Sequence, residues 1–444
     1  MQKLSKTSRI KELVLSPNVR VIVGYTNAVI YDFKNGKAYQ ISKTAGILLE
    51  KVFRGNEIQK REITLKNWMR EKRDNRAKIV IKNLPRFIEQ LKRAEILIPF
   101  RSIRKRKTGY SKMEMGFSIP NTPTFAILEC TSRCNFHCPH CYLGEKSFNW
   151  ELGLATIFRI LTQLQRLKVQ SVLLTGGEIC LREDLGKIIT FAHQLGLKVE
   201  MSTNGSLLYN NKRLMRLIER YVDKIQITLY GLSEETYRKF SPDRNIFKKV
   251  VTVIERFQQR RPEIVLVTFT LNPANYQDLP VFLQFVKERK LKYKIGRTLP
   301  IGLALTDKNL LLNSCYNSFV EEFERKCLRV FTPIFRNRGC PLDRVTVLSN
   351  GKVTICPLLR DTKFIFGDVN FSDIKVIWDK RMRPIFPLFC VDNLEICKDC
   401  EFKYLCGGGC PALWNALEPI KKDKSPPCVS QYLTARCYLK PLKI

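Results

Sequence analysis

The feature that most limits how this chain can fold is a regular alternation of short apolar runs and amphipathic stretches in its middle. Strand-like runs recur from Thr124 to Gly296, and helix-like stretches such as 185–195 and 245–257 separate them. This alternation predicts βα units around a parallel sheet. Six units predict an α/β fold two units short of eight strands, a partial (β/α)6 TIM barrel. The six runs are 124–129, 171–174, 198–202, 224–229, 264–270 and 292–296.

A smaller unit precedes the barrel. Apolar runs at 19–25 and 28–33 come before Asn35-Gly36, a dipeptide typical of tight hairpins, and helical spacing starts near Ala45. We expect a small winged-helix-like α+β domain there. After about residue 327 the periodicity decays, and we expect a loop-rich module held by metal–thiolate bonds. The expected division is a domain over 1–100, a basic linker over 101–120, the barrel over 121–315 and a cysteine-rich extension over 316–444.

Charge and composition limit the class of protein. The chain has 444 residues, with 77 Lys and Arg against 41 Asp and Glu, a net charge of +36. Its 44% of hydrophobic residues exclude a mostly disordered chain. Because there is no secretory signal and no uncharged apolar stretch of about 18 residues, we expect a cytoplasmic protein without a membrane span.

Sixteen cysteines against three histidines indicate a thiolate-based metal protein. Cys134, Cys138 and Cys141 follow the first strand-like run, separated by three and two residues. Three thiolates on one loop suit a [4Fe–4S] cluster, which normally takes four ligands, so one iron would stay open to an exchangeable ligand. The alternative is zinc, with His140 as a strained fourth ligand.

This C-x3-C-x2-C triad, followed by the aromatic Tyr142, resembles the radical S-adenosylmethionine (SAM) superfamily. The resemblance implies that the open iron chelates the methionine amine and carboxylate of SAM. It also implies that electron transfer then cleaves SAM to a 5′-deoxyadenosyl radical, which abstracts hydrogen from the substrate. No general acid or base can be assigned.

Elements after the next strand-like runs resemble the SAM-binding loops of that family. Gly176-Gly177-Glu178 follows the second run and is similar to the element that contacts the methionine amino group. Glycines let backbone approach a ligand, and a carboxylate complements an ammonium. Thr203-Asn204 follows the third run and resembles the ribose-contacting element, and Thr228 ends the fourth. The resemblance thus implies a cofactor site made by Tyr142, Gly176, Gly177, Glu178, Thr203, Asn204 and Thr228.

Seven of the cysteines in the last third of the chain form a further pattern: Cys340, Cys356, Cys397, Cys400, Cys406, Cys410 and Cys428. Their spacing is similar to that of the SPASM extension of radical enzymes that mature peptides and proteins. That extension holds two auxiliary [4Fe–4S] clusters. The resemblance assigns one cluster to Cys397, Cys400, Cys406 and Cys428, and the other to Cys340, Cys356 and Cys410. The second set lacks a fourth thiolate, which leaves Cys315, Cys327, Cys390 or an open iron as alternatives. We expect Cys130, Cys180 and Cys437 to be buried or incidental thiols. A pair of zinc ribbons is the alternative for the whole extension.

The N-terminal unit resembles, by its size and order of elements, the PqqD-like peptide recognition element of such maturases. It would bind a precursor's leader as an added strand, with the helix near 84–94 as groove wall. Residues 1–120 carry 28 basic and 10 acidic side chains. Such a surface would attract an acidic leader, although solvated basic surfaces explain the charge equally well.

The resemblances together imply a peptide maturase that forms a thioether (sactionine-type) or related cross-link, as in bacteriocin biosynthesis. Carbon–carbon cross-linking, epimerisation and formylglycine formation use the same extension. The partners implied are a precursor peptide with a leader and an electron donor such as flavodoxin or ferredoxin. An RNA-modifying radical enzyme, suggested by the charge, and a non-catalytic zinc protein are the alternatives from other classes.

Overall fold

The computed structural model of the chain describes most of the barrel and parts of the units on either side of it. The described residues are 13–24, 27–53, 75–99, 119–144, 149–299, 301–306, 338–360, 363–395, 397, 400–412 and 440–441. The expected basic linker lies almost wholly outside them, as do Cys315, Cys327, Cys428 and Cys437.

Six parallel strands form the central part of the largest sheet, paired in chain order from β6 to β11. Each expected strand-like run corresponds to one of them. The strands are β6 (Phe125–Thr131), β7 (Ser171–Gly176), β8 (Lys198–Thr203), β9 (Lys224–Thr228), β10 (Val265–Leu271) and β11 (Tyr293–Arg297). The parallel order follows from the helices between the strands, because each returns the chain to the same edge of the sheet.

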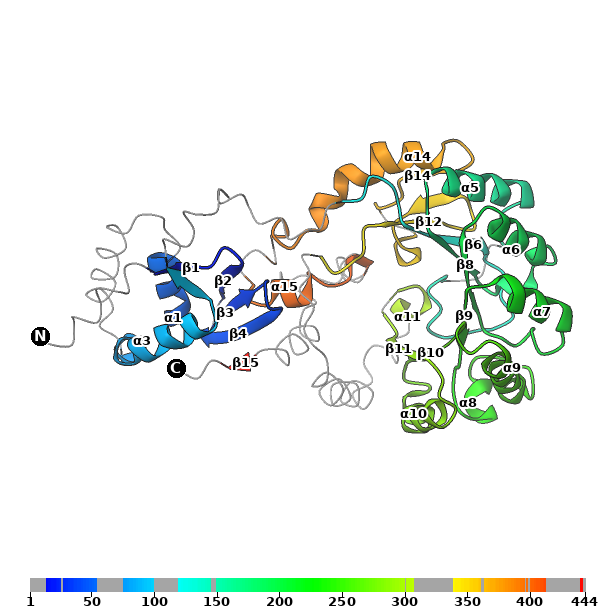
Figure 1. Cartoon of the computed structure of the whole chain (residues 1–444). Coiled ribbons are helices and arrows are strands. Elements are labelled where there is room, and N and C mark those ends of the chain that lie inside the picture. The colour runs from blue at the N-terminus through cyan, green and yellow to red at the C-terminus, as the bar shows by residue number, and fades with distance from the viewer. Residues whose placement is uncertain are drawn as a thin grey trace, which may run out of the picture.

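Helices cover the outer face of this curved sheet (Figure 1). They are α5 (Leu154–Arg166), α6 (Leu185–Gln194), α7 (Lys212–Tyr221), α8 (Glu234–Arg238), α9 (Ile246–Arg260) and α10 (Leu279–Glu288), and α11 (Leu303–Thr306) follows β11. Apolar positions at helical spacing, such as Val250, Val253, Ile254 and Phe257 of α9, are buried against the strands. The predicted α/β partial barrel is confirmed.

In its described residues from 338 onward, the cysteine-rich extension contains regular strands and helical turns, whereas we expected a loop-rich module. β12 (Arg344–Val347) pairs in parallel with β6, and β13 (Lys352–Thr354) and β14 (Gly367–Asp368) add antiparallel strands, which makes a sheet of nine strands. The helical turns α14 (Ile374–Ile377), η7 (Trp378–Met382) and η8 (Arg383–Phe389) then bury Trp378 and Phe386 in the barrel's apolar core. Apolar packing organises this segment.

The N-terminal unit has the expected strands and helices. β2 (Val19–Val23), β3 (Asn27–Asp32) and β4 (Lys37–Ser42) form an antiparallel meander, and β15 (Lys440–Pro441) pairs with β4. α1 (Lys43–Leu48), the π-helical turn η2 (Leu49–Phe53) and α3 (Asn75–Arg93) follow, and β1 (Leu13–Leu15) pairs with β5 (Leu97–Pro99). The strands β1, β5 and β15 were not expected, since short strands carry little periodicity.

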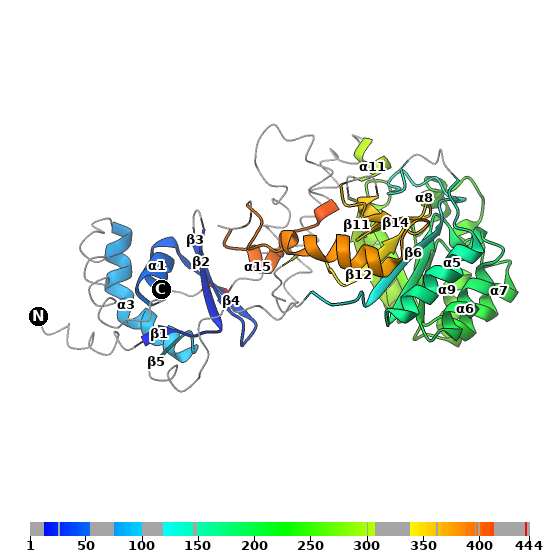
Figure 2. The same ribbon diagram turned by 90° about the horizontal axis from the view of Figure 1, so that it is seen from above.

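Strand β3 is buried on both faces, which explains how this unit is held. Ala28 and Ile30 face a core shared with the helices, whereas Val29 and Tyr31 face residues of the extension. Those residues surround α15 (Lys403–Cys406), which lies between the N-terminal unit and the barrel in both views (Figures 1 and 2). Among the described helices, none combines the length and apolarity that crossing a bilayer requires.

Candidate functional site

The loop that follows β6 brings three thiols to one cavity. Cys134, Cys138 and Cys141 all line a cavity of about 270 Å³ where the barrel strands end. Phe136, between the first two cysteines, is fully buried in the barrel core. The amide of Cys141 donates to the carbonyl of Cys138 at 3.1 Å, which closes the turn. The short spacing therefore turns all three side chains toward the same space.

Two glycines at the end of β7, Gly176 and Gly177, form the adjacent wall of this cavity. A Cβ at Gly176 would collide with the carbonyl oxygen of Thr131, and one at Gly177 would collide with those of Ser132 and Arg133. The φ of Gly176 is +152°, a conformation that suits glycine. The amide of Gly177 donates to the Thr131 carbonyl at 2.8 Å. Both positions therefore require glycine, because a larger residue would prevent the close packing of this backbone on the start of the cysteine loop.

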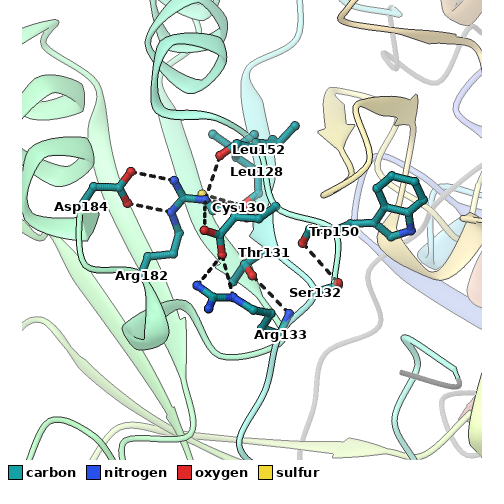
Figure 3. A network of polar contacts seen from close by, with 10 residues as sticks. Leu128, Cys130, Thr131, Ser132, Arg133, Trp150, Leu152, Arg182 and Asp184 are labelled. Carbon is teal, nitrogen blue, oxygen red and sulfur yellow. Dashed lines mark hydrogen bonds and ion pairs between the residues drawn. The ribbon is translucent and has the colours of Figure 1, made fainter. Parts of the chain in front are cut away.

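The buried guanidinium of Arg182 fastens the start of the cysteine loop from the other side (Figure 3). It donates to the carbonyls of Cys130 and Leu152, each at 2.9 Å, and forms two hydrogen bonds with the Asp184 carboxylate at 2.8 and 2.9 Å. The amide of Ser132 donates in turn to the carbonyl of Trp150. A planar five-donor group is suited to hold several acceptors at once. Arg182 thus positions the strand end from which the cysteine loop departs.

Glu178 lies behind the cavity wall rather than in it. Its side chain is fully buried and is not among the described residues that line the cavity. The carboxylate accepts hydrogen bonds from the Thr203 hydroxyl at 2.7 Å, the Asn204 amide at 2.7 Å and the Cys180 amide at 2.9 Å. Burial raises the pKa of Glu178, and these donors oppose the rise. Glu178 therefore connects the loop after β7 to the loop after β8 through hydrogen bonds. Its contact with the amino group of SAM stays a prediction.

Thr203, Asn204 and Thr228 lie at the strand ends where they were expected, and all three line the cavity. The side-chain amide of Asn204 donates to the Asn135 side chain at 2.9 Å. Asn135 follows Cys134 directly, so the loop after β8 also ties down the cysteine loop. The hydroxyl of Thr228 lies 3.1 Å from that of Thr268 on the next strand.

Tyr142 links the cysteine loop to the extension. Its ring lines the cavity, and its hydroxyl donates to the buried Glu129 carboxylate of β6 at 3.2 Å. Arg360, four residues after Cys356, donates to both oxygens of Glu129 at 2.7 and 3.0 Å. Burial raises the pKa of Glu129, and the Arg360 guanidinium opposes this rise. A buried ion pair therefore joins the two cysteine-bearing regions.

Several residues that line the cavity were missed. His140 has a buried Nδ1 with no hydrogen-bond partner among the described residues, and burial lowers its pKa to about 4, so the ring is neutral. The sequence indicated His140 only as a strained fourth ligand of a zinc ion, so its place beside a cluster was missed. The other missed residues are Leu143, Tyr230, Thr270, Thr298, Leu299, Ile301 and Leu358. Most come from strand ends beyond the elements that the sequence singled out.

A second cavity lies away from this chemistry. It has a volume of about 790 Å³ and lies along α6, between α5 and α7, on the outside of the barrel. None of its lining residues belongs to the cysteine triad. Cys180 lines it, but burial and the Glu178 charge raise the pKa of this thiol well above its usual value. A protonated thiol is a poor ligand and nucleophile.

In the extension, Cys340, Cys356 and Cys410 lie near one another, as their assignment to one cluster requires. Burial raises the pKa of Cys340 to about 12 and that of Cys356 to about 11, and the charge of neighbouring thiols in this group contributes to both. Gly339 lies against the backbone of Gly409, so the two segments that carry Cys340 and Cys410 are in contact. Of the three cysteines that the sequence offered as a fourth ligand, Cys390 lies within the described residues, and Arg338 interacts electrostatically with both Cys390 and Cys340.

The second expected set is partly described. The amide of Cys400 donates to the carbonyl of Cys397 at 3.1 Å, and burial, with a contribution from the charge of Cys406, raises the pKa of Cys400. Cys406 ends α15, directly before Gly407. Cys428 lies outside the described residues. None of the twelve described cysteines forms a disulfide.

The donor set fits an iron–sulfur cluster with a small-molecule ligand. No three His, Cys, Asp or Glu side chains in the described ranges converge as they would around a single metal ion. Three thiols spread around one cavity suit a cluster with several irons better than a zinc ion. The unpartnered Nδ1 of His140 offers a polar contact at the same cavity.

Comparisons with known proteins agree with this site. Residues 128–286 match the model of the "Radical SAM superfamily", and residues 340–401 match the SPASM "Iron-sulfur cluster-binding domain". Among curated proteins, "Fe-coproporphyrin III synthase" of Methanosarcina barkeri is 28% identical over 39% of this chain and 43% of its own length. A "Probable GTP 3',8-cyclase" of Saccharolobus islandicus is 31% identical over 35% of this chain and 50% of its own length. The chain thus spans about half the length of these relatives.

Solved structures share the fold at low sequence identity. Streptococcus suis SuiB bound to precursor peptide SuiA covers 93% of this chain and 98% of its own, with a TM-score of 0.54 and 16% identity. The anSMEcpe structure with bound AdoMet covers 71% of this chain and 96% of its own, with a TM-score of 0.55 and 15% identity.

The two matched domains imply [4Fe–4S] clusters and SAM as cofactors, which confirms the prediction made from the cysteine spacing. The match over residues 128–286 includes the cysteine triad and the loops after β7 and β8, and the match over 340–401 includes four of the expected auxiliary cysteines. This chain is therefore built around a radical SAM domain followed by a SPASM domain.

Proposed function

We propose that this chain is a radical SAM enzyme that modifies a ribosomally made precursor peptide, and that the modification is a thioether (sactionine-type) or related cross-link. The observation that carries the proposal is the packing of the N-terminal sheet on the auxiliary cysteine loop. Val29 and Tyr31 of β3 share one apolar cluster with Cys397 and Tyr404. A peptide bound to this sheet would be held beside the SPASM domain.

The cavity supplies the second line of support. Cys134, Cys138 and Cys141 would hold the cluster, and the loops after β7 and β8 would hold SAM beside it. When bound, the cluster and SAM supply hydrogen-atom abstraction from an unactivated C–H bond. The chain's own contribution is to orient the cofactors, since the buried Phe136 anchors the cysteine loop and Glu178 connects the loops after β7 and β8.

The ligand set of the extension favours thioether chemistry. Cys340, Cys356 and Cys410 supply three thiols where a [4Fe–4S] cluster normally takes four. The remaining position is open to Cys390, to a cysteine outside the described residues, or to a thiolate of the substrate. The last alternative would bring a substrate cysteine close to the cavity, which is what a thioether requires.

Recognition of a leader would use the edge of the N-terminal sheet. β2 is the last strand of this sheet in the described part of the chain, and its other side pairs with β3. An extended peptide can add to such an edge through main-chain hydrogen bonds. The fold shared with SuiB, which binds its precursor peptide SuiA, covers this unit as well as the barrel.

Related chemistries and a different substrate class remain as competing proposals. Carbon–carbon cross-linking, epimerisation and formylglycine formation fit the same domains. An RNA substrate is favoured only by the basic charge of the chain. Reduction of the cluster would be the task of a flavodoxin or ferredoxin.

The test is co-expression of the chain with short peptides encoded next to its gene, followed by mass spectrometry. Each cross-link should remove two hydrogens from the peptide, and tandem spectra should map it to a cysteine. A C134A variant is the matched control and should leave the mass unchanged. An unchanged mass together with D-residues would identify an epimerase, and a modified RNA with unmodified peptides would refute the proposal.

A further inference from the structure

The cavity of about 790 Å³ on the outside of the barrel forms a groove along α6, and we call it the α6 groove. Part of its lining is apolar and includes Leu181, Leu217 and the stacked rings of Phe158 and Phe191. Gly186 also lines it, and a Cβ at this position would lie 3.2 Å from a methyl carbon of Leu217. The absence of a side chain at Gly186 therefore helps to keep the groove open.

Unpaired basic side chains line this groove. Lys187 of α6 and Arg213 of α7 are exposed, and neither forms an ion pair within the described part of the chain. Both lie near the start of a helix whose first turn contains no acidic residue, and a cation at that end opposes the helix dipole. Arg182 is already paired with Asp184, and Glu183 is the one acidic side chain among the described lining residues. These cations therefore suit an acidic partner better than they suit helix stability.

Two side chains in contact connect the α6 groove to the cavity of the triad. The Sγ of Cys180 lines the groove and lies 3.5 Å from the hydroxyl oxygen of Thr203, which lines the triad cavity. Arg182, also in the groove lining, donates to the carbonyl of Cys130, at the strand end before the cysteine loop (Figure 3). The two cavities share no lining residue in the described ranges. A partner in the groove would thus come close to the triad while SAM and a substrate occupy the triad cavity.

We propose that the α6 groove is the docking site of the acidic electron-carrier protein that reduces the cluster of the triad. In this proposal, which rests on the proposed function, carboxylates of the carrier face Lys187 and Arg213, and an apolar side chain packs beside Leu217. One electron passes from the carrier to the cluster, so the carrier is oxidised by one electron, the cluster is reduced by one, and no atom is transferred. The net charge of +36 would also attract an acidic carrier.

The first test maps the contact by cross-linking. The full-length, cluster-loaded protein is mixed without oxygen with a purified acidic flavodoxin, and a carbodiimide joins lysine amines to carboxylates that touch them. Mass spectrometry of the digest should find cross-links at Lys187 and at the neighbouring Lys212, and high salt should reduce their yield. Cross-links confined to lysines outside α6 and α7 would overturn the proposal.

The second test reverses the charges of the groove. K187E/R213E should slow deoxyadenosine formation about tenfold with reduced flavodoxin but not with dithionite, which needs no docking site. Glutamate suits the start of a helix, so thermal stability should not fall. The matched control is K287E/K294E, which reverses two exposed cations on α10 and β11 and should keep both rates. G186M fills the groove without changing charge and should also slow the flavodoxin reaction. Unchanged flavodoxin rates in K187E/R213E, or an equal loss in the control, would overturn the proposal.

Failure of this inference is distinguishable from failure of the proposed function. If a precursor is modified with flavodoxin as reductant and K187E/R213E shows no loss, the function stands and the docking site is wrong. If no precursor is modified but cross-linking and cluster reduction depend on Lys187 and Arg213, the docking site stands and the proposed reaction is wrong. If K187E/R213E weakens binding of the precursor or of RNA but not of flavodoxin, the groove holds that other partner and the proposal is overturned.

Discussion

Two regions of this molecule bring cysteines together by different means. In the barrel, Cys134, Cys138 and Cys141 share one short loop, which Phe136 anchors in the apolar core and the loop after β7 braces. In the extension, Cys340, Cys356 and Cys410 come from distant segments that meet through contacts such as Gly339 on Gly409. The first arrangement is held by the fold itself. In the second, metal–thiolate bonds would supply more of the stability, because they close long loops.

Replacing single cysteines should have the largest effect, and it tests whether the two cysteine-bearing regions differ in what holds them together. C138A should abolish cluster binding at the triad and SAM cleavage, with the barrel's thermal unfolding unchanged, because the loop is held by other contacts. C400A should leave SAM cleavage intact but increase amide exchange in β3, which packs on its loop. Iron analysis, deoxyadenosine formation and hydrogen exchange are the measurements. The control C130A removes a buried thiol outside the triad and should retain its iron. A barrel that unfolds in C138A would contradict the comparison.

The buried ion pair between the regions should have the next largest effect. R360A would leave the Glu129 carboxylate buried without its partner, and we expect a loss of about 3–5 kcal/mol in the free energy of unfolding. The measurement is urea unfolding of the metal-free protein. The double variant E129Q/R360Q removes both charges and should lose less than R360A alone. Equal losses in the two variants would show that packing, not charge compensation, is responsible.

The contact between the N-terminal unit and the extension should contribute less. The buried Tyr31 hydroxyl donates to the carbonyl of Glu401, so Y31F should cost about 1–3 kcal/mol and loosen the unit. Limited proteolysis should then release the N-terminal unit sooner. Y39F, at a partly exposed tyrosine of the neighbouring strand, serves as control. Unchanged proteolysis in Y31F would mean that apolar packing alone holds the interface.

The smallest effect concerns the pH dependence of the barrel site. Burial raises the pKa of Glu178 above its ordinary value of 4.5, so the folded state keeps this proton at a pH where the unfolded state has lost it. The stability due to Glu178 is therefore complete below about pH 4.5 and declines as pH rises through the folded-state pKa. As the pH rises through the folded-state pKa of Glu178, the free energy of unfolding of the native chain should fall relative to that of E178Q. Parallel stability–pH curves for the two proteins would show that the carboxyl does not titrate in this way.

The sequence predicted the parts of this protein that depend on local order. The six barrel strands, the triad and the positions of Gly176, Thr203 and Thr228 at strand ends all follow from short-range periodicity and spacing. Short-range patterns did not predict three other features. These are the strands β12 to β14, the burial of Trp378, and the places of Thr298 and Leu358 in the cavity lining. They depend on pairing between segments that are far apart in the chain, and short apolar runs do not specify their partners.

By itself, the sequence determined that cysteines dominate two regions of the chain, and it predicted iron–sulfur clusters there from thiol spacing and from resemblance to a known family. Only the tertiary structure decided that Glu178 connects two loops, that Arg360 pairs with Glu129, and that residues after β11 line the cavity of the triad. The physical reason is that each of these roles depends on burial and on a partner from another segment. Burial and partners are properties of the packed fold rather than of any single stretch of chain.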